Sequence, residues 1–354
     1  MTDKKLFIRN YLGQTPDSLT TNGVYNSPDI ICSGDTPIGN PHQITGKDAY
    51  ENGTPDLNDQ VPAEKNYVYV RGLNPTNSKL ESTIFLFYCK PSVILWPQNW
   101  KNAGIGYKGN QEQNGVHVIA SENEITSTKH PYKWELNVES IPYSLIVWPF
   151  ADAGKNDPLL LPEPKTLAEM SNFLLDNPEL AIKSTIEVDS SQPTIHETVP
   201  IVGPAEGGIL NIGVVCKGIP PGGYLQFSVQ GPDPANSINF PKTLIPIVGY
   251  TPTIQVKWSA GFDSTMEISY WKEDTTPPDG ASLNPIVGFM ESSSDENKKL
   301  IDRAKTEAPN QLAKSHFYGS PENLNKSTDS LDSVPIQTLY LLGMIAYVLK
   351  DMSR

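Results

Sequence analysis

A glycine-rich segment is the first stretch of this 354-residue chain whose spacing could do chemistry. Gly104, Gly106 and Gly109 reproduce G-x-G-x-x-G, the spacing that cradles a dinucleotide pyrophosphate between a strand and a helix. Here the motif follows the polar sequence PQNWKNA and leads into NQEQNG, a poor helix, so no helix N-terminus would meet the phosphates. We therefore interpret it as a loop and expect no nucleotide cofactor.

The candidate metal ligands lack the spacing that metal sites require. The five histidines are scattered, and His196-Glu197 is not followed by the second histidine of a zinc helix. Asp56 and Asp59 could offer oxygens to calcium, but the glycine and the closing glutamate of an EF-hand loop are missing. The sequence predicts no metal and no cofactor.

No residue pattern points to a nucleophile. The G-x-S-x-G elbow is absent. The three cysteines have no C-x-x-C spacing, and Cys89 and Cys216 lie in apolar runs, which favours buried thiols. A hydrolase triad assembled across loops stays open as an alternative, because triad residues need not be close in sequence. The expectation is a protein that is not an enzyme.

Two groups of apolar residues are the candidates for binding. Trp100 and Tyr107, on predicted loops, could form a platform for a sugar or a protein, the alternative being a role in the core. The run 336–349 is apolar on nearly all sides and, as a helix of about 21 Å, is shorter than the bilayer's hydrocarbon core of about 30 Å. It is expected to be buried in its own fold, in an oligomer or partner groove, or partly in a membrane.

The contact residues expected on this C-terminal helix are Leu339, Leu342, Ile345 and Leu349. They lie in segment 334–350, for which a protein partner or self-association is the expected role. Contact with a membrane or a glycan is a further possibility that the sequence leaves open.

Short strands with turn-rich connections must position these side chains. Alternating or continuous apolar runs predict strands at 66–71, 83–89, 132–138, 143–148, 185–188, 194–202, 208–216, 223–229, 253–259 and 265–271. Thr166 and Glu169 form a capping box that starts a helix ended by Asn177-Pro178. Further helices are predicted over 297–307 and, with Ser333 as the cap and Pro335 in the first turn, over the C-terminal run.

The predicted fold class is mainly β, with two antiparallel β-sandwich (Ig-like) domains, an inter-domain helix and a C-terminal helical appendage. The expected boundaries are 1–155 for the N-terminal sandwich, 156–184 for the helical connection, 185–276 for the second sandwich and 277–354 for a linker and helices. A high content of proline (32) and glycine (26) agrees with a loop-rich β architecture.

Charge excludes one class of partner. The net charge of −13 leaves no basic face to neutralise phosphates, so nucleic acid is not expected as the ligand. The first residues contain no apolar run long enough for a signal peptide. The expected location is the cytoplasm, or outside the cell by a route without a cleavable signal.

The N-terminal half resembles bacterial Ig-like, CARDB-like β-sandwich modules over residues 24–152. The matching segments are NSPDII, NYVYVRGLNPTNSKLESTIFLFYCKPSVILWPQNW, YKWEL and PYSLIVWPFAD. Gly72 and Ser144-Leu-Ile depart from the pattern, the latter replacing a cysteine-bearing closing strand. The resemblance implies a non-catalytic module of exported or surface proteins.

As a whole, the acidic, β-rich chain is similar to accessory proteins of bacterial toxin clusters such as the motility-associated killing factor system. The function expected from both resemblances is non-catalytic binding or an accessory role, through sandwich loops and the C-terminal helix. The alternative is a membrane-acting component whose C-terminal helix inserts with a partner.

Overall fold

The computed structural model describes residues 5–16, 26–54, 65–100, 106–107, 115–135, 143–150, 161–291, 294–326 and 333–352. The chain divides into two compact units. The first contains residues 1–90, 97–162 and 177–184, and the second contains residues 91–96, 163–176 and 185–354.

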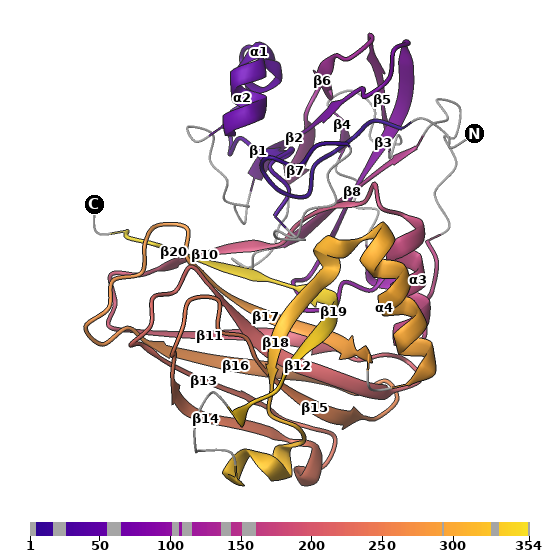
Figure 1. Ribbon diagram of the computed structural model, residues 1–354. Coiled ribbons are helices and arrows are strands. Elements are labelled where there is room, and N and C mark those ends of the chain that lie inside the picture. Colours follow the sequence, from indigo (N-terminus) through magenta and orange to yellow (C-terminus); the bar gives the residue numbers. More distant parts are fainter. Residues whose placement is uncertain are drawn as a thin grey trace. The chain divides into compact units, whose positions relative to one another are not determined.

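The first unit, drawn mainly in indigo and magenta in Figure 1, is built from antiparallel sheets. One sheet contains β1 (Ile30–Cys32), β2 (Lys65–Leu73), β4 (Gly106–Tyr107), β6 (Ile125–Ser127) and β7 (Tyr132–Glu135). The other runs in the order β5 (Gly115–Ala120), β3 (Leu80–Cys89), β8 (Ser144–Phe150) and β9 (Ala181–Lys183).

These sheets share one core. Ile30, Val68 and Val70 from the first sheet cluster with Ile84 and Leu145 from the second, all of them fully buried. Alternation places successive side chains of a strand on opposite faces, so each sheet offers one apolar face to the other. The first unit is therefore a β-sandwich.

Two short helices, α1 (His42–Thr45) and α2 (Lys47–Asn52), belong to the same unit. Ile44 of α1 joins a smaller core cluster with Ile31, Tyr67 and Tyr69, which come from β1 and β2. These residues alternate with the sandwich-facing ones, so the helices cover the other face of that sheet.

The second unit has one long mixed sheet. Its order is β10 (Thr185–Asp189), β20 (Ala346–Lys350), β17 (Ser282–Met290), β12 (Gly208–Lys217), β15 (Pro252–Trp258), β18 (Leu312–Phe317) and β19 (Ile336–Met344). Strand β17 also pairs with β19, which closes five of these strands into a ring. Every residue of β17 is buried, as expected for a strand with neighbours on both sides.

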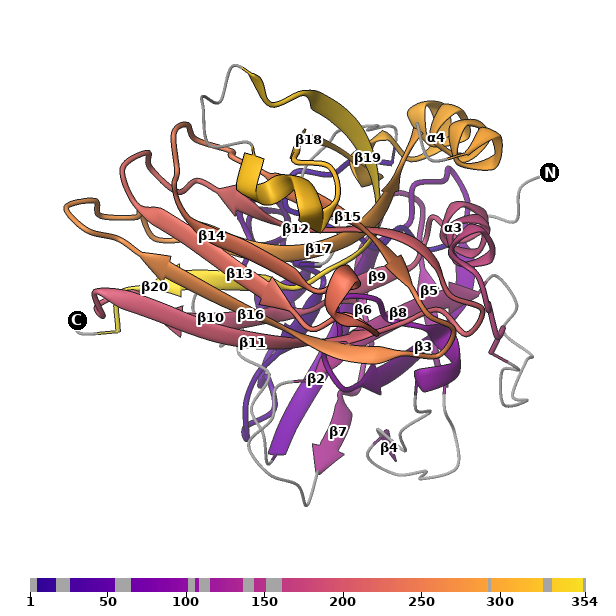
Figure 2. The ribbon, with the colours of Figure 1, turned by 90° about the horizontal axis from the view of Figure 1, so that it is seen from below.

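The other sheet of the second unit, here called the outer sheet, is antiparallel. Its order is β11 (Thr194–Val202), β16 (Asp263–Trp271), β13 (Tyr224–Val229) and β14 (Ile238–Leu244), and Figure 2 shows these strands side by side. Leu225, Phe227 and Val229 of β13 are buried and alternate with partly exposed residues. The outer sheet thus has one apolar face in the core and one face open to solvent.

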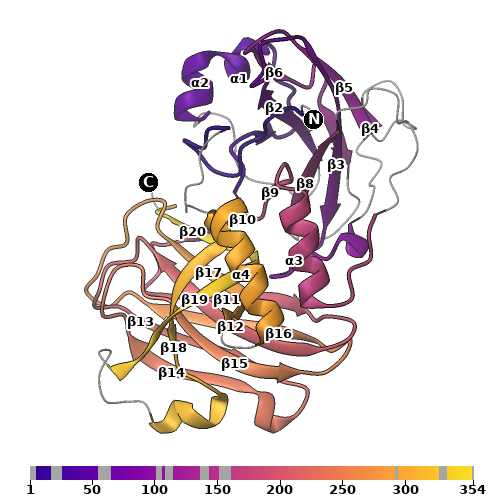
Figure 3. The same cartoon turned by 45° about the vertical axis from the view of Figure 1, so that its right-hand side comes forward.

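Helices α3 (Leu167–Asp176) and α4 (Asp295–Glu307) lie side by side in the second unit (Figure 3). The predicted capping box of α3 is confirmed, since the Glu169 amide donates to Thr166 Oγ1 at 3.1 Å and the Thr166 amide to Glu169 Oε2 at 3.3 Å. Arg303 of α4 pairs with Asp176 of α3 at 2.7 Å. Short 3-10 helices occupy Pro97–Asn99, Pro234–Asn236, Pro309–Gln311 and Pro321–Lys326.

The mainly β prediction is confirmed, and each strand predicted from the sequence has a counterpart in the described residues. The predicted C-terminal helix is wrong. Its residues form two strands, β19 and β20. Strand β19 pairs with β17 and β18, and strand β20 pairs with β17 and β10. The linker predicted from Pro277 onward is wrong from Ser282, where β17 begins. The C-terminal residues complete the main sheet of the second unit, so they are no appendage.

Candidate binding face

The solvent-facing side of the outer sheet is the candidate site. Register pairs side chains across β11, β16 and β13: His196 with Ser269 and Gln226, Thr198 with Glu267 and Ser228, and Thr194 with Trp271 and Tyr224. Because directly opposed residues of an antiparallel pair point to the same side, all of these side chains share the outward face. The face is polar along most of its length and aromatic at one end.

The aromatic end is built around Trp271 and Tyr224, both partly exposed. The ammonium of Lys242 lies 4.4 Å from the centroid of the Trp271 ring and 4.8 Å from that of Tyr224. A β-bulge between β13 and β14 sits beside this lysine, which matches the tendency of bulges to re-aim a side chain. Glu273 pairs with Lys242 at 3.3 Å and holds the cation over both rings.

The middle of the face contains a serine–histidine pair. His196 Nδ1 lies 2.8 Å from Ser269 Oγ, the separation that a nucleophile and its base need. Within the described residues no carboxylate forms an ion pair with His196, and the centroid of its ring lies 6.1 Å from that of Trp271. A triad needs that third group to orient the imidazole, so the geometry supports no assignment of a nucleophile.

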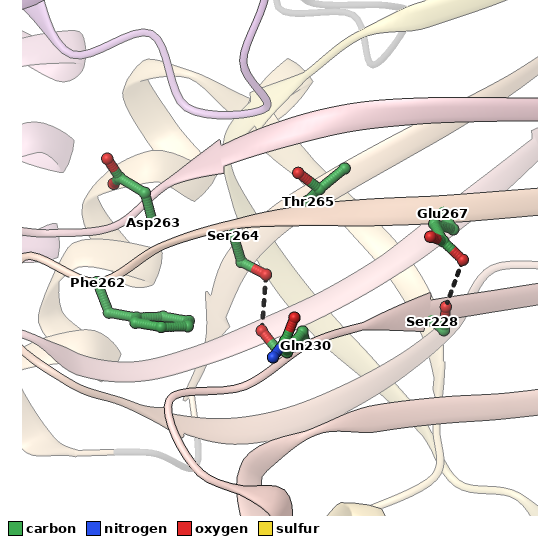
Figure 4. Close-up of a pocket in the computed structure, with 7 residues that line it drawn as sticks. All are labelled: Ser228, Gln230, Phe262, Asp263, Ser264, Thr265 and Glu267. Carbon is green, nitrogen blue, oxygen red and sulfur yellow. Dashed lines mark hydrogen bonds between the residues drawn. The ribbon is translucent and has the colours of Figure 1, made fainter.

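An open cavity of about 410 Å³ occupies the other end of the face (Figure 4). It is lined by Ser228, Gln230, Phe262, Asp263, Ser264, Thr265 and Glu267. Ser264 Oγ donates to the Gln230 carbonyl at 2.6 Å, and Ser228 Oγ donates to Glu267 Oε2 at 3.4 Å. The carboxylates of Asp263 and Glu267 make the lining rich in hydrogen-bond acceptors.

A second open cavity, of about 380 Å³, lies near the ends of β10 and β16. Lys272 Nζ, part of its lining, already donates to the carbonyls of Ser190 and Ser191 at 2.9 and 3.0 Å. The rest of its lining consists of serine, threonine, proline and aspartate residues, and no aromatic ring lines it. The outer-sheet face is the better candidate because it combines rings with polar groups.

Several groups whose pKa is shifted by desolvation lie away from this face. Desolvation raises the pKa of the inward-pointing Glu197 carboxyl on β11, and it lowers the pKa of His316 on β18. Burial raises the pKa of Cys89 to about 12 and also raises that of Cys216, so both thiols stay protonated, as the sequence predicts for buried cysteines. These groups affect stability and do not belong to the candidate face.

The structure places Trp100 in the core of the first unit, with 4% of its surface exposed. Its ring centroid lies 5.8 Å from that of Phe87 and 6.4 Å from that of Trp148. This favours the core role over a platform. The backbone of Tyr107 belongs to β4, but its side chain is not described. Gly104 and Gly109 of the G-x-G-x-x-G motif and the loop from Asp56 to Asp59 also lie outside the described residues.

The C-terminal contact candidates are also buried. Leu339 and Ile345 have no exposed surface, and Leu342 and Leu349 expose 1% each. They contribute to the core of the second unit and offer no outward surface in this structure. In the part of the chain that the structure describes, no helix is long and apolar enough to cross a membrane, and no group of three or more histidine, cysteine or acidic side chains could hold a metal ion.

No family model matches the chain, and no curated protein matches it. Among solved structures, the match to CBD12 from CALX1.2 covers 66% of this chain and 80% of CBD12, with 9% sequence identity and a TM-score of 0.16. The match to the calcium binding domain CBD12 of CALX1.1 covers 68% of this chain and 87% of that domain, with 8% sequence identity and a TM-score of 0.16. The match to red sea bream transglutaminase covers 69% of this chain and 31% of the transglutaminase chain, with 9% sequence identity and a TM-score of 0.18. TM-scores this low carry no conclusion about a ligand or an activity.

Sequence reasoning missed Trp271 and Tyr224 as site residues. The available signal was alternation: in DSTMEISYW the residues Thr265, Glu267, Ser269 and Trp271 share one face, opposite Met266 and Ile268. A tryptophan that follows polar residues on the same face is a candidate for a solvent-facing ring. The pairing with Tyr224 requires the register between strands, which the sequence does not contain.

Proposed function

We propose that this protein is a non-catalytic binding protein whose contact surface is the outward face of the outer sheet. One observation carries the proposal: Trp271 and Tyr224 lie directly opposite each other on neighbouring strands and are partly exposed on the outward face, where Lys242 lies over both rings. Aromatic rings supply much of the contact energy where proteins bind ligands, and a rigid sheet presents them at low entropic cost. The polar cavity at the other end of the face supplies groups that could orient a ligand.

The proposed contact surface contains none of the contact residues predicted from the sequence. Trp100 and the C-terminal leucines are buried, whereas the outer-sheet face is accessible over four strands. The resemblance to accessory proteins of bacterial toxin clusters supports placing this binding role within such a system, which is likewise a proposal.

A double variant tests the proposed surface. Full-length protein is immobilised and exposed to neutral polysaccharides, polylysine, and vesicles of phosphatidylcholine with and without phosphatidylserine. The Trp271→Ala/Tyr224→Ala variant is expected to lose at least about tenfold in affinity for whatever the wild type binds, because two anchors are removed. Ile119→Ala removes an exposed apolar side chain of the first unit and serves as the control.

Thermal melting of each variant shows whether the fold is kept. Equal affinity of the wild type and the folded double variant would refute the proposed surface, whatever the ligand.

A further inference from the structure

The polar cavity at the end of the outward face opposite the aromatic pair is complementary to a hydrogen-bond donor. Asp263 accepts from the Gly203 amide at 3.1 Å, and Glu267 accepts from Ser228 at 3.4 Å, so each carboxylate keeps lone pairs for further donors. No lysine or arginine is among the residues that line the cavity, all of which the structure describes. An anionic ligand would meet two carboxylates without a compensating cation, which excludes phosphates and carboxylates as the bound group.

A flat apolar element lies within the same lining. Phe262 is one of the residues that line the cavity (Figure 4), and its ring centroid lies 5.4 Å from that of Trp258. A ligand that stacks one face on a ring while donating several hydrogen bonds to carboxylates and to the Gln230 side chain has the chemistry of a sugar. Its ring carbons are apolar on one face, and its hydroxyls lie around the edge.

The face continues from this cavity to a second aromatic site. Strand β16 runs from Asp263 to Trp271, a span of roughly 26 Å. Between the two ends lie the hydrogen-bonding side chains of Ser269, His196 and Gln226. A ring at each end with polar groups between them suits an extended chain of several sugar units better than a single small molecule.

We infer that the ligand of the outer-sheet face is a neutral, linear polysaccharide that lies along β16, with one sugar ring against Phe262 and another against Trp271 and Tyr224. The inference rests on the proposed function. Lys242 covers both rings of the aromatic pair, so a sugar must displace its ammonium to stack there. Lys242 therefore competes with the ligand.

Affinity electrophoresis of the full chain tests this inference, in gels that contain a linear glucan, xylan or mannan. At least one of the three is expected to retard the wild type. Glu267→Gln and Phe262→Ala are each expected to weaken retardation roughly tenfold, since each removes one main contact. Lys242→Ala is expected to strengthen it severalfold, which a purely structural role of Lys242 would not do. Ile119→Ala is again the control.

Two results would overturn the inference. Retardation by none of the three polysaccharides excludes the ligand class. Binding of polylysine alone, lost in Glu267→Gln, identifies the cavity as a site for a cationic peptide instead. In the second case the proposed surface survives while the sugar fails, whereas unchanged affinity in the Trp271→Ala/Tyr224→Ala variant refutes the surface itself.

Discussion

Arg71 Nε lies 2.8 Å from Asp29 Oδ1 in the first unit, and neither side chain is exposed to solvent. Arg9 completes the cluster: its backbone amide and Nε both donate to Asp29 Oδ2 at 2.9 Å, and its Nη2 donates to Oδ1 at 2.6 Å. Burial lowers the pKa of Arg71, and the neighbouring Asp29 opposes that shift. One carboxylate therefore balances two buried guanidinium groups.

Arg71 Nη2 donates to the Pro28 carbonyl at 3.1 Å, and further guanidinium protons go to backbone carbonyls of the two short helices. Arg71 Nη1 donates to Ile44 at 2.8 Å and to Ala49 at 3.0 Å, and Arg9 Nη1 donates to Tyr50 at 2.6 Å. These bonds attach α1 and α2 to the sheet. Helices of four and six residues are unstable in isolation, so tertiary contacts of this kind must stabilise them.

Asp29→Asn is expected to lower the free energy of unfolding of the first unit by about 3–5 kcal/mol. The substitution leaves two buried cations without a counter-charge, and that desolvation penalty is uncompensated. Urea denaturation followed by tryptophan fluorescence measures the change. Glu81→Gln, which breaks an exposed pair with Lys79, is the control and should leave the midpoint unchanged. A loss below about 1 kcal/mol for Asp29→Asn would show that water reaches the cluster.

Trp100→Ala is expected to destabilise the first unit by about 3–5 kcal/mol, because it opens a cavity between Phe87 and Trp148. The same urea titration measures it, with Ile119→Ala, an exposed site in the same unit, expected to change stability by less than about 0.5 kcal/mol. If Trp100→Ala left stability intact and impaired binding, the platform role considered from the sequence would be restored.

The sequence predicted strands well where apolar residues alternate. The strand expected at 194–202 has the same bounds as β11, and 265–271 lies within β16. It failed for 336–350, where the run is apolar at nearly every position. Such a run fits a buried strand as well as a buried helix, and periodicity alone does not separate them. The deciding partners are distant in sequence, since β20 pairs in parallel with β10, Glu187 opposite Val348.

Gly343, within the predicted C-terminal helix, is evidence in the sequence against that helix. A glycine weakens a helix interior and, within a strand, often marks a close approach of another backbone. A Cβ at Gly343 would lie 1.7 Å from the Val93 carbonyl oxygen and 2.9 Å from Ile94 Cα. The segment 91–96 crosses the second unit there, and its Val93 amide donates to the Pro200 carbonyl at 3.0 Å.

Gly343→Ala is therefore expected to lower the free energy of unfolding of the second unit by at least about 2 kcal/mol, since backbone and not a flexible side chain must move. Differential scanning calorimetry measures the change. Gly39→Ala, where an added Cβ meets nothing within 4 Å, is the control and should keep the melting temperature. An unchanged melting temperature in Gly343→Ala would place segment 91–96 elsewhere.

Glu197 gives the second unit a pH dependence with a definite sign. It lies on the inward side of β11 between the buried Ile195 and Val199, and desolvation raises the pKa of its carboxyl above the ordinary value of 4.5. Its charge in turn helps to raise the pKa of Tyr347, whose hydroxyl donates to the Thr198 carbonyl at 2.8 Å. Above pH 4.5 and up to its raised pKa, the folded protein therefore binds more protons at Glu197 than the unfolded chain does.

Stability from this group must then fall as pH rises through that window, because the ionised carboxylate is disfavoured only in the folded state. Glu197→Gln removes the cost, so the variant is expected to be more stable than the wild type at pH 7, by less than about 1 kcal/mol after screening by solvent. The difference should shrink as pH falls to 4.5, in urea denaturation at both values. The exposed Glu122→Gln is the control. A variant that is less stable than the wild type at pH 7 would mean that the Glu197 carboxylate is stabilised by a partner, and the sign would reverse.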